Sequence, residues 1–531
     1  MKSIKYIFMG LVAAACGMTM GSCSGDLDEH PYTFIDPGSF YQSEEETNEA
    51  LNGVYNRLRN MYTANSCLYL ANIELYTEQA WPSYNKNAMH LLNHWYDVNN
   101  ASTGNSDRGV YRIWSAAYDC INRANTVLAR EKGVQMSDEA HNRIIGQCEF
   151  LRAYAMWHLM RLWGGVPIIT TPTNGLDGLE VPRNTIDECY DAVTKDLENA
   201  AAKLPQRGES GYDVWRASQG ACYALLGEIY LYRASMNNNN TDYLTKSRDY
   251  SKKVIDSGKY SLMPEFTDQY YWFNANAKNN QESIFELQFS ATPGQFNQMH
   301  IRFGLGRTYK SMGCYQYARM GVSGYLYREM VNNGDKRAKA LLSSFKLNDG
   351  TECTYDPATC HWVPAITNDR NAEHRCVFNC KYFDNRTDAS LEMPCANFPM
   401  LRYAEVLLNY AEASNLLKGG DGLAQLNLIR ERAGLSAYSY TTQAAMDEEI
   451  FQQRRFEFVG EGKIFYDELR RGVLGQYASQ KCKQGKADGI TYFDADDVDF
   501  KAGRHFLFKI PQGDLDSNPA LVQNPDAQPE Q

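Results

Sequence analysis

Apolar residues recur at three- and four-residue spacing through most of this chain, which is the period of an amphipathic helix. Polar, glycine- or proline-rich stretches separate the periodic segments, and Gly164-Gly165 and Pro205 are typical helix stops. The pattern predicts a mainly α-helical protein. Its expected helices cover residues 43–62, 108–130, 138–163, 185–204, 216–234, 243–257, 400–417, 425–435 and 448–471.

Small residues define one face of the segment 216–234. They are Ala217, Gly220, Ala221, Ala224 and Gly227. At this spacing they form a flat stripe against which a second helix can pack closely, and segment 243–257 is the expected partner. Helix pairs of this kind are typical of tetratricopeptide-like units, although no clean period of about 34 residues is present. The predicted fold is therefore a scaffold of tetratricopeptide-like helix pairs.

The helical rhythm breaks between residues 265 and 399, a stretch rich in Asn, Tyr, Phe and Cys with short β-prone runs such as SIFELQF at 283–289. We expect a large irregular insertion with a few short strands and helices. Long loops on a rigid scaffold are a common place for binding sites. The predicted organisation is one domain at 41–531, with a helical scaffold at 41–264 and 400–510 and a ligand-binding region at 265–399.

The first residues have the pattern of a secretory signal peptide. Lys5 precedes a nearly uncharged apolar run at 6–20, which is too short to span a bilayer. Cys23 follows the small residues Gly21 and Ser22, and this arrangement resembles a bacterial lipobox, whose cysteine becomes acylated. Cys16 is a rival site. The alternative is an ordinary signal, with Cys23 left free or removed.

Charge and composition narrow the class of partner. The net charge is −11, and loss of the two lysines in a signal peptide at 1–22 would make it −13. This balance argues against nucleic acid, whose binding relies on Lys and Arg, and against electrostatic binding to anionic lipid. Residues 23–40 contain two prolines and read as an extended tether. No later stretch is apolar and long enough to cross a membrane.

Five cysteines cluster in the irregular region, with His361 and His374 among them: Cys353, Cys360, Cys376, Cys380 and Cys395. Structural zinc sites usually contain two close cysteine pairs. Only Cys376 and Cys380 come near that spacing, so no metal ligand set is assigned. A structural zinc ion, disulfides and plain buried or partly exposed thiols all remain open for this cluster.

Catalytic motifs are weak throughout the chain. No nucleophile elbow and no phosphate-binding loop is present. His90 and His94 have metal-compatible spacing, but Leu91 stands where a zincin needs its glutamate, so two partly buried histidines are the better reading. The interleaved charges of 454–471 are predicted to be ion pairs that fix the last helices to the scaffold. We expect a protein that is not an enzyme.

Several long motifs, in order, resemble the SusD/RagB family. FLRAYAMWHLMRLWGGVPII and RASQGACYALLGEIYLY resemble its N-terminal half; RYAEVLLNYAEA, LIRERAGL, RRFEFVGEGKIFYDELRR and IPQGDLDSNPALVQNP resemble its C-terminal half. These segments occupy residues 150–169, 216–232, 402–413, 428–435, 454–471 and 510–525. With the lipobox region, the resemblance runs from Cys23 to the C-terminus and is weakest across 265–400.

The resemblance implies about eight helices in four tetratricopeptide-like pairs, with the irregular region as a ligand-binding surface. It also implies a lipoprotein anchored through Cys23 at the outer membrane and exposed at the cell surface. Its implied partner is a SusC-like TonB-dependent transporter, to which it delivers oligosaccharide as a hinged lid, without breaking bonds and without a cofactor. A peptide or another nutrient is the alternative cargo.

Sugar binding needs flat aromatic faces against pyranose C–H groups and polar groups that reach adjacent hydroxyls. The chain holds 36 Tyr, 22 Phe and 8 Trp, enough for both a core and a binding face. Three polar segments at 77–87, 268–280 and 354–362 carry aromatics that we expect to be exposed. The candidate aromatic residues are Trp81, Tyr84, Trp95, Tyr96, Tyr271, Trp272 and Trp362, and the candidate polar partners are Asn85, Asn274 and Arg302.

Overall fold

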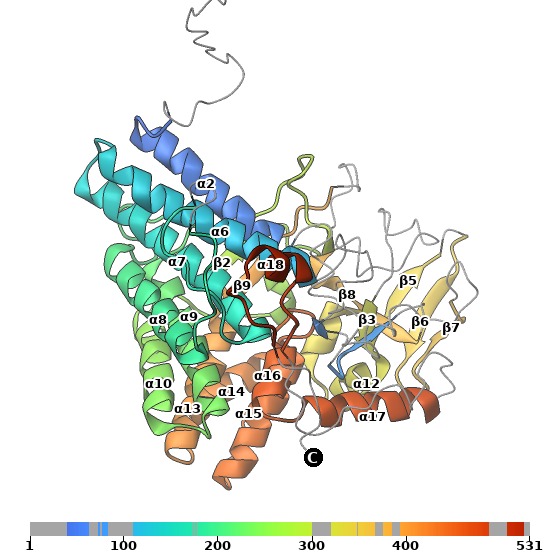
Figure 1. Ribbon diagram of the computed structural model, residues 1–531. Helices are drawn as coiled ribbons and strands as arrows, with labels where there is room; N and C mark the ends of the chain where they lie inside the picture. Colours follow the sequence, from blue (N-terminus) through green and yellow to red (C-terminus); the bar gives the residue numbers. More distant parts are fainter. Residues whose placement is uncertain are drawn as a thin grey trace, which may run out of the picture.

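The fold is known from a computed structural model, which places a body of helices on one side and a strand-containing region on the other (Figure 1). The structure describes residues 40–62, 73–74, 77–82, 110–173, 175, 178–299, 320–347, 349–366, 375–384, 393–487 and 507–524. Cys23 and the expected signal peptide and tether lie outside these ranges, except Phe40.

The first part of the chain forms a row of antiparallel helix pairs. Its helices are α2 (Glu44–Asn60), α6 (Val110–Arg130), α7 (Asp138–Trp163), α8 (Ile186–Lys203), α9 (Gln219–Met236) and α10 (Thr241–Asp256), and η3 (Glu131–Gly133) follows α6. Helix α2 packs on α6, α7 on α8 and α9 on α10, and neighbouring pairs also touch. These bounds agree with the predicted segments to within a few residues.

Local sequence explains where these helices begin and how closely they pack. Thr185 caps α8 in a capping box with Glu188, and Ser218 caps α9 by accepting from the backbone N–H of Ala221. At Gly227 on α9, an added Cβ would lie 2.6 Å from Oγ of Ser251 on α10. The small-residue stripe therefore permits the predicted close approach of this pair.

The scaffold continues after the insertion with α13 (Tyr403–Leu417), α14 (Leu423–Arg432), α15 (Gln443–Glu457) and α16 (Ile464–Arg470). Helix α13 packs directly on α10, so the two scaffold parts meet although the insertion separates them in sequence. The predicted single helix at 448–471 is wrong. Gly460 and Gly462 have φ values of 72° and 73°, which end α15 before α16 begins.

Most of the short antiparallel strands lie in the insertion, and one, at 80–82, comes from earlier in the chain. Strands β1 (Ala80–Pro82), β3 (Met320–Ser323), β8 (Cys376–Asn379) and β4 (Leu341–Leu342) form one sheet; β2 (Ser283–Leu287) and β9 (Phe398–Arg402) form a second; β5 (Ser344–Lys346), β6 (Glu352–Asp356) and β7 (His361–Val363) form a third. Around them lie α12 (Gly324–Asn332), η4 (Phe266–Gln269), η6 (Lys336–Ala340) and η7 (Cys380–Tyr382); α17 (Leu474–Ala487) and α18 (Gln512–Ser517) follow α16. The predicted mainly α-helical fold with short strands is confirmed.

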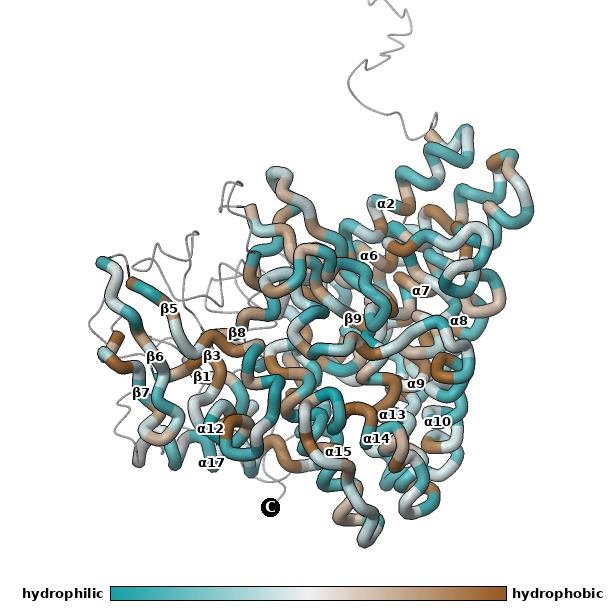
Figure 2. Tube along the Cα trace, turned by 180° about the vertical axis from the view of Figure 1, so that it is seen from behind, coloured by the Kyte–Doolittle hydropathy of each residue, from teal (hydrophilic) through white to brown (hydrophobic). Residues whose placement is uncertain are grey.

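The largest hydrophobic cluster joins helices and strands, with hydrophobic positions running along β3 and β8 (Figure 2), and a smaller cluster packs α13, α14 and α15 together. The five clustered cysteines all lie in this interior as free thiols. Burial raises the pKa of Cys376 to about 12. The thiol reading of the cluster therefore holds in the structure, and the disulfide alternative does not.

A buried network of charges ties the insertion to the last helices. Glu457 of α15 accepts from Arg402 at 2.9 Å and from Arg337 at 3.2 Å, and it also pairs with Arg432. Glu461 adds bonds to Arg402 and to Lys381. The four arginines of 454–471 also form ion pairs, which join Arg454 to Asp467, Arg455 to Glu78, Arg470 to Glu412 and Arg471 to Asp447. The predicted role of these charges as ion pairs within the scaffold is confirmed.

Candidate functional site

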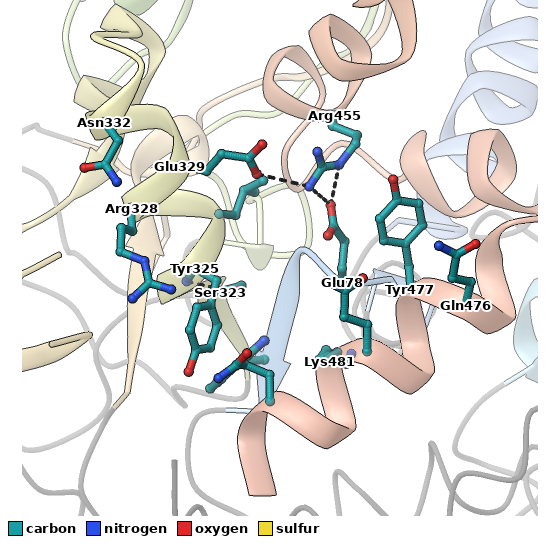
Figure 3. Close-up of a pocket in the computed structure, with 14 residues that line it drawn as sticks. Glu78, Ser323, Tyr325, Arg328, Glu329, Asn332, Arg455, Gln476, Tyr477 and Lys481 are labelled. Carbon is teal, nitrogen blue, oxygen red and sulfur yellow. Dashed lines mark hydrogen bonds and ion pairs between the residues drawn. The ribbon is translucent and has the colours of Figure 1, made fainter. Parts of the chain in front are cut away.

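A cavity of about 580 Å³ lies between α12 and α17, at the border of the insertion and the helical scaffold (Figure 3). We call it the α12–α17 cavity. Its size falls within the range of small-ligand pockets. The lining residues are Glu78, Trp81, Ser323, Tyr325, Leu326, Arg328, Glu329, Asn332, Arg455, Gln476, Tyr477, Gln480, Lys481 and Gln484.

Strand pairing builds the floor of the α12–α17 cavity. Trp81 of β1 lies opposite Gly321 of β3, and an added Cβ at Gly321 would lie 2.2 Å from Sγ of Cys376. Only glycine therefore allows β3 to lie so close to β8. The ring of Trp81 lies 5.5 Å from that of Tyr325, the second residue of α12. The two rings form an aromatic floor.

One face of α17 forms a wall of the cavity. Gln476, Gln480 and Gln484 are four residues apart, so their amides follow one another along the helix. Tyr477 stands on the same wall, with its ring 5.4 Å from the guanidinium carbon of Arg455. Lys481 donates to the carbonyls of Thr77 at 2.7 Å and Ala80 at 3.1 Å, and these bonds hold α17 against β1.

Arg455 bridges two acidic side chains at the back of the cavity. It pairs with Glu78 and, at 3.3 Å, with Glu329 (Figure 3). Burial raises the pKa of Glu78, and the charge of Arg455 opposes that shift. The back wall is thus an internally compensated ion-pair cluster. What the cavity offers a ligand is aromatic surface together with amide, hydroxyl and guanidinium groups.

Trp81 is the one predicted site residue within the described chain that lines this cavity. Its side chain is only 2% exposed, which differs from the exposed turn position that we expected, because β1 pairs with β3. Tyr271 lies elsewhere, against Lys278 at 5.5 Å. Trp272 packs edge-on against Phe383 at 5.5 Å.

Two further predicted residues serve the fold. Asn274 donates to the carbonyl of Asp268 at 2.8 Å and accepts from the N–H of Asn276, so its amide closes its own loop. The expectation that Trp362 is exposed is wrong: it is 1% exposed and donates to the carbonyl of Cys376 at 3.0 Å. Pairing of β6 with β7 turns its indole into the core. The predicted residues Tyr84, Asn85, Trp95, Tyr96 and Arg302, and also His90 and His94, lie outside the described residues.

Helix α17, which forms one wall of the cavity, was not among the helices predicted from the sequence. Its hydrophobic pattern is weak, because few apolar positions face the core. The available signal was the repeat of glutamine at 476, 480 and 484 in the segment LGQYASQKCKQGKA. Three long amide side chains at i, i+4 and i+8 share one helix face. When that face is exposed, the amides can donate hydrogen bonds to a polar ligand and accept them from it.

In the parts of the chain that the structure describes, no group of three or more His, Cys, Asp and Glu side chains is arranged to hold a metal ion. No helix in those same parts combines the length and the apolar character needed to cross a bilayer.

Comparison with known proteins covers nearly the whole chain. A family model described as the SusD family matches residues 229–526. A second, described as "Starch-binding associating with outer membrane", matches residues 27–231.

A SusD-like protein of Bacteroides ovatus is 24% identical, and the alignment covers 97% of each chain. Among solved structures, a SusD homolog from Bacteroides thetaiotaomicron superposes with a TM-score of 0.76 at 19% identity, over 92% of this chain and 98% of that one. A structure described as a laminarin-binding SusD-like protein gives a TM-score of 0.71 at 22% identity, over 92% and 100%. The SusD family model alone spans more than half of the sequence, and so the chain belongs to the SusD family.

Proposed function

We propose that this protein captures an oligosaccharide in the α12–α17 cavity. The observation that carries the proposal is the combination of Tyr325, backed by the buried ring of Trp81, with the amide-bearing wall of α17 in one cavity. A protein of the same fold is described as laminarin-binding, which supports a glycan as the class of ligand. Its role is to bind and deliver, without cleaving the glycan.

The chemistry of the cavity suits a pyranose chain. The rings of Tyr325 and Tyr477 present faces for the apolar C–H side of a sugar, while Gln476, Gln480 and Asn332 are exposed amides that can reach its hydroxyls. Each aromatic contact adds about 0.5–1.5 kcal/mol beyond area burial. Each hydrogen bond adds about 1 kcal/mol, because it replaces one to water. Affinity is therefore modest, which suits a protein that must release its cargo.

The proposal places the protein at the surface of the outer membrane. Cys23 carries the lipid anchor, and residues 24–40 form a tether that gives the body freedom to move. The partner is a SusC-like TonB-dependent transporter, on which this protein acts as a lid and to which it passes the glycan. The match to a family described as starch-binding and associated with the outer membrane supports this placement.

Replacing Tyr477 with Ala is expected to weaken binding of the preferred glycan about tenfold, which corresponds to about 1.4 kcal/mol. The ring is half-buried and stands on the cavity wall, so the change removes a stacking face. Isothermal titration calorimetry against a panel of oligosaccharides measures the change. Tyr440→Ala is the matched control, because Tyr440 is 40% exposed and does not line this cavity.

Three results would contradict the proposal. If the Tyr477→Ala variant binds the glycan with the same affinity as the wild type, the glycan does not bind in this cavity. Absence of binding to every glycan of the panel, with uptake still dependent on the protein, would favour a peptide or another nutrient as cargo. Release of reducing ends by the purified protein would show that it cleaves glycans.

A further inference from the structure

A second concave surface lies between α2 and the end of β2, with a volume of about 1140 Å³. We call it the α2–β2 groove. Its lining residues are Asn52, Gly53, Tyr55, Asn56, Arg59, Asp213, Val214, Trp215, Arg216, Lys278, Asn279, Glu286, Leu287, Gln288, Phe289 and Gln295. None of these also lines the α12–α17 cavity, so the two are separate surfaces.

Trp215 stands at the edge of this groove with 61% of its side chain exposed, and no other described tryptophan is among the exposed large hydrophobic residues. The turn that carries it is fixed. The Trp215 N–H donates to Oδ1 of Asp213 at 3.0 Å, and the next residue, Arg216, donates to Asn52 at 2.7 Å and to Gln147 at 3.2 Å. A rigidly presented indole that contributes little to packing indicates a contact surface for a ligand.

Positive charge gathers on the same groove. Arg59, Arg216 and Lys278 line it, against the carboxylates of Asp213 and Glu286. Glu286 is buried, which raises its pKa, and it accepts from the Asn397 amide and from the N–H of Asn279. The groove is therefore net positive although the whole chain carries −11.

The guanidinium of Arg59 lies over the ring of Phe289, with its carbon 5.9 Å from the ring centre. Its Nη2 donates to Asn56 at 2.6 Å, but its buried Nε has no hydrogen-bond partner. Among the residues that the structure describes, it has no ion-pair partner either. The ammonium group of Lys278 donates one hydrogen bond to the carbonyl of Phe289 at 3.0 Å and lies over the ring of Tyr271. The segment 268–280, predicted to bind sugar, thus supplies one end of this groove.

We propose that the α2–β2 groove is a second carbohydrate site, selective for oligosaccharides that carry carboxylates. The indole of Trp215 stacks on a pyranose ring, and Arg59, with Lys278, binds the carboxylate of a uronic acid. A guanidinium suits this role because its N–H groups match the two oxygens of a carboxylate. Amides from Asn52, Asn56 and Gln295 lie within the same groove and can serve the ring hydroxyls.

The experiment is a calorimetric titration of the full chain with an oligogalacturonate and with a neutral oligoglucoside of the same length. For the acidic ligand, Trp215→Ala and Arg59→Gln are each expected to weaken binding at least tenfold. Binding should also weaken as salt is raised from 0.05 to 0.5 M, because the exposed charges become screened. For the neutral ligand, neither substitution should change the affinity more than twofold.

Tyr477→Ala serves as the reciprocal control, since it alters the α12–α17 cavity alone and should leave binding of the oligogalacturonate within twofold of the wild type. The proposal is overturned if the wild type does not bind the acidic ligand, or if Trp215→Ala and Arg59→Gln bind it as well as the wild type. It is also overturned if the two substitutions weaken both ligands equally. Because Trp215 is largely exposed, the Trp215→Ala variant is expected to keep the wild-type melting temperature, which verifies that a binding loss is local.

Discussion

Replacing Glu457 with Gln is expected to destabilise the protein by about 3–5 kcal/mol, the cost of breaking a buried charge pair. Glu457 is fully buried and accepts from three guanidiniums, those of Arg337, Arg402 and Arg432. The amide of Gln has about the same volume as the carboxylate but carries no charge. Its NH₂ group would face the N–H groups of the arginines, and two donors cannot form a hydrogen bond with each other. Denaturant unfolding followed by tryptophan fluorescence measures the loss.

The same substitution has a pH signature. Burial alone would raise the pKa of Glu457, but Arg432, Arg402 and Arg337 outweigh it and hold the pKa well below its ordinary 4.5. The stabilisation is then complete above about pH 4.5 and is lost as the pH falls further. The difference between variant and wild type should shrink below pH 4.5. Glu431→Gln, at an exposed position of α14, is the control, and a Glu457→Gln variant as stable as this control would contradict the network's role.

Replacing Cys23 with Ala is expected to move the protein from the membrane fraction to the soluble fraction. Each buried methylene of an acyl chain contributes about 0.8 kcal/mol, so several chains hold a protein that has little other affinity for lipid. Cell fractionation and immunoblotting measure the distribution. Thermal unfolding of the purified variant should match the wild type, because Cys23 precedes the first described helix, α2, by about 20 positions in the sequence.

Cys16→Ala is the matched control for the anchor, since Cys16 is the rival lipidation site. It should leave the protein in the membrane fraction. A Cys23→Ala protein that stays membrane-bound in cells lacking the transporter would contradict the anchor. In that strain the transporter cannot hold the protein at the membrane, so any remaining membrane binding must have another cause.

Hydrophobic periodicity was sufficient to predict the helices from α2 to α14 that pair along the scaffold, because each of them buries one face against its neighbours, but it did not show the break between α15 and α16. The polar stripe of α13 shows how far such reasoning reaches. Glu405, Asn409 and Glu412 stand at i, i+4 and i+7, so they lie on one face, and they are buried, but nothing near them in the sequence identifies their partners. Those partners are Lys463, Arg454 and Arg470, about 45 to 58 positions along the chain.

The candidate site was less predictable, for two physical reasons. Exposure of an aromatic residue depends on strand pairing over long sequence separations: Trp81 pairs across to Gly321, and Trp362 is buried by neighbouring strands. The wall of the cavity comes from α17, whose amphipathic pattern is weak because one face borders the cavity. The family resemblance predicted the fold correctly, because long motifs identify the family. It could not predict which individual residues contact the ligand.

The most direct test of the central claim is a structure of the protein with its preferred oligosaccharide bound. The account predicts a sugar between α12 and α17, with one ring against Tyr325 or Tyr477 and hydroxyls within hydrogen-bond distance of Gln476 or Gln480. An oligosaccharide bound elsewhere on the protein, with the α12–α17 cavity empty at saturating ligand, would contradict it.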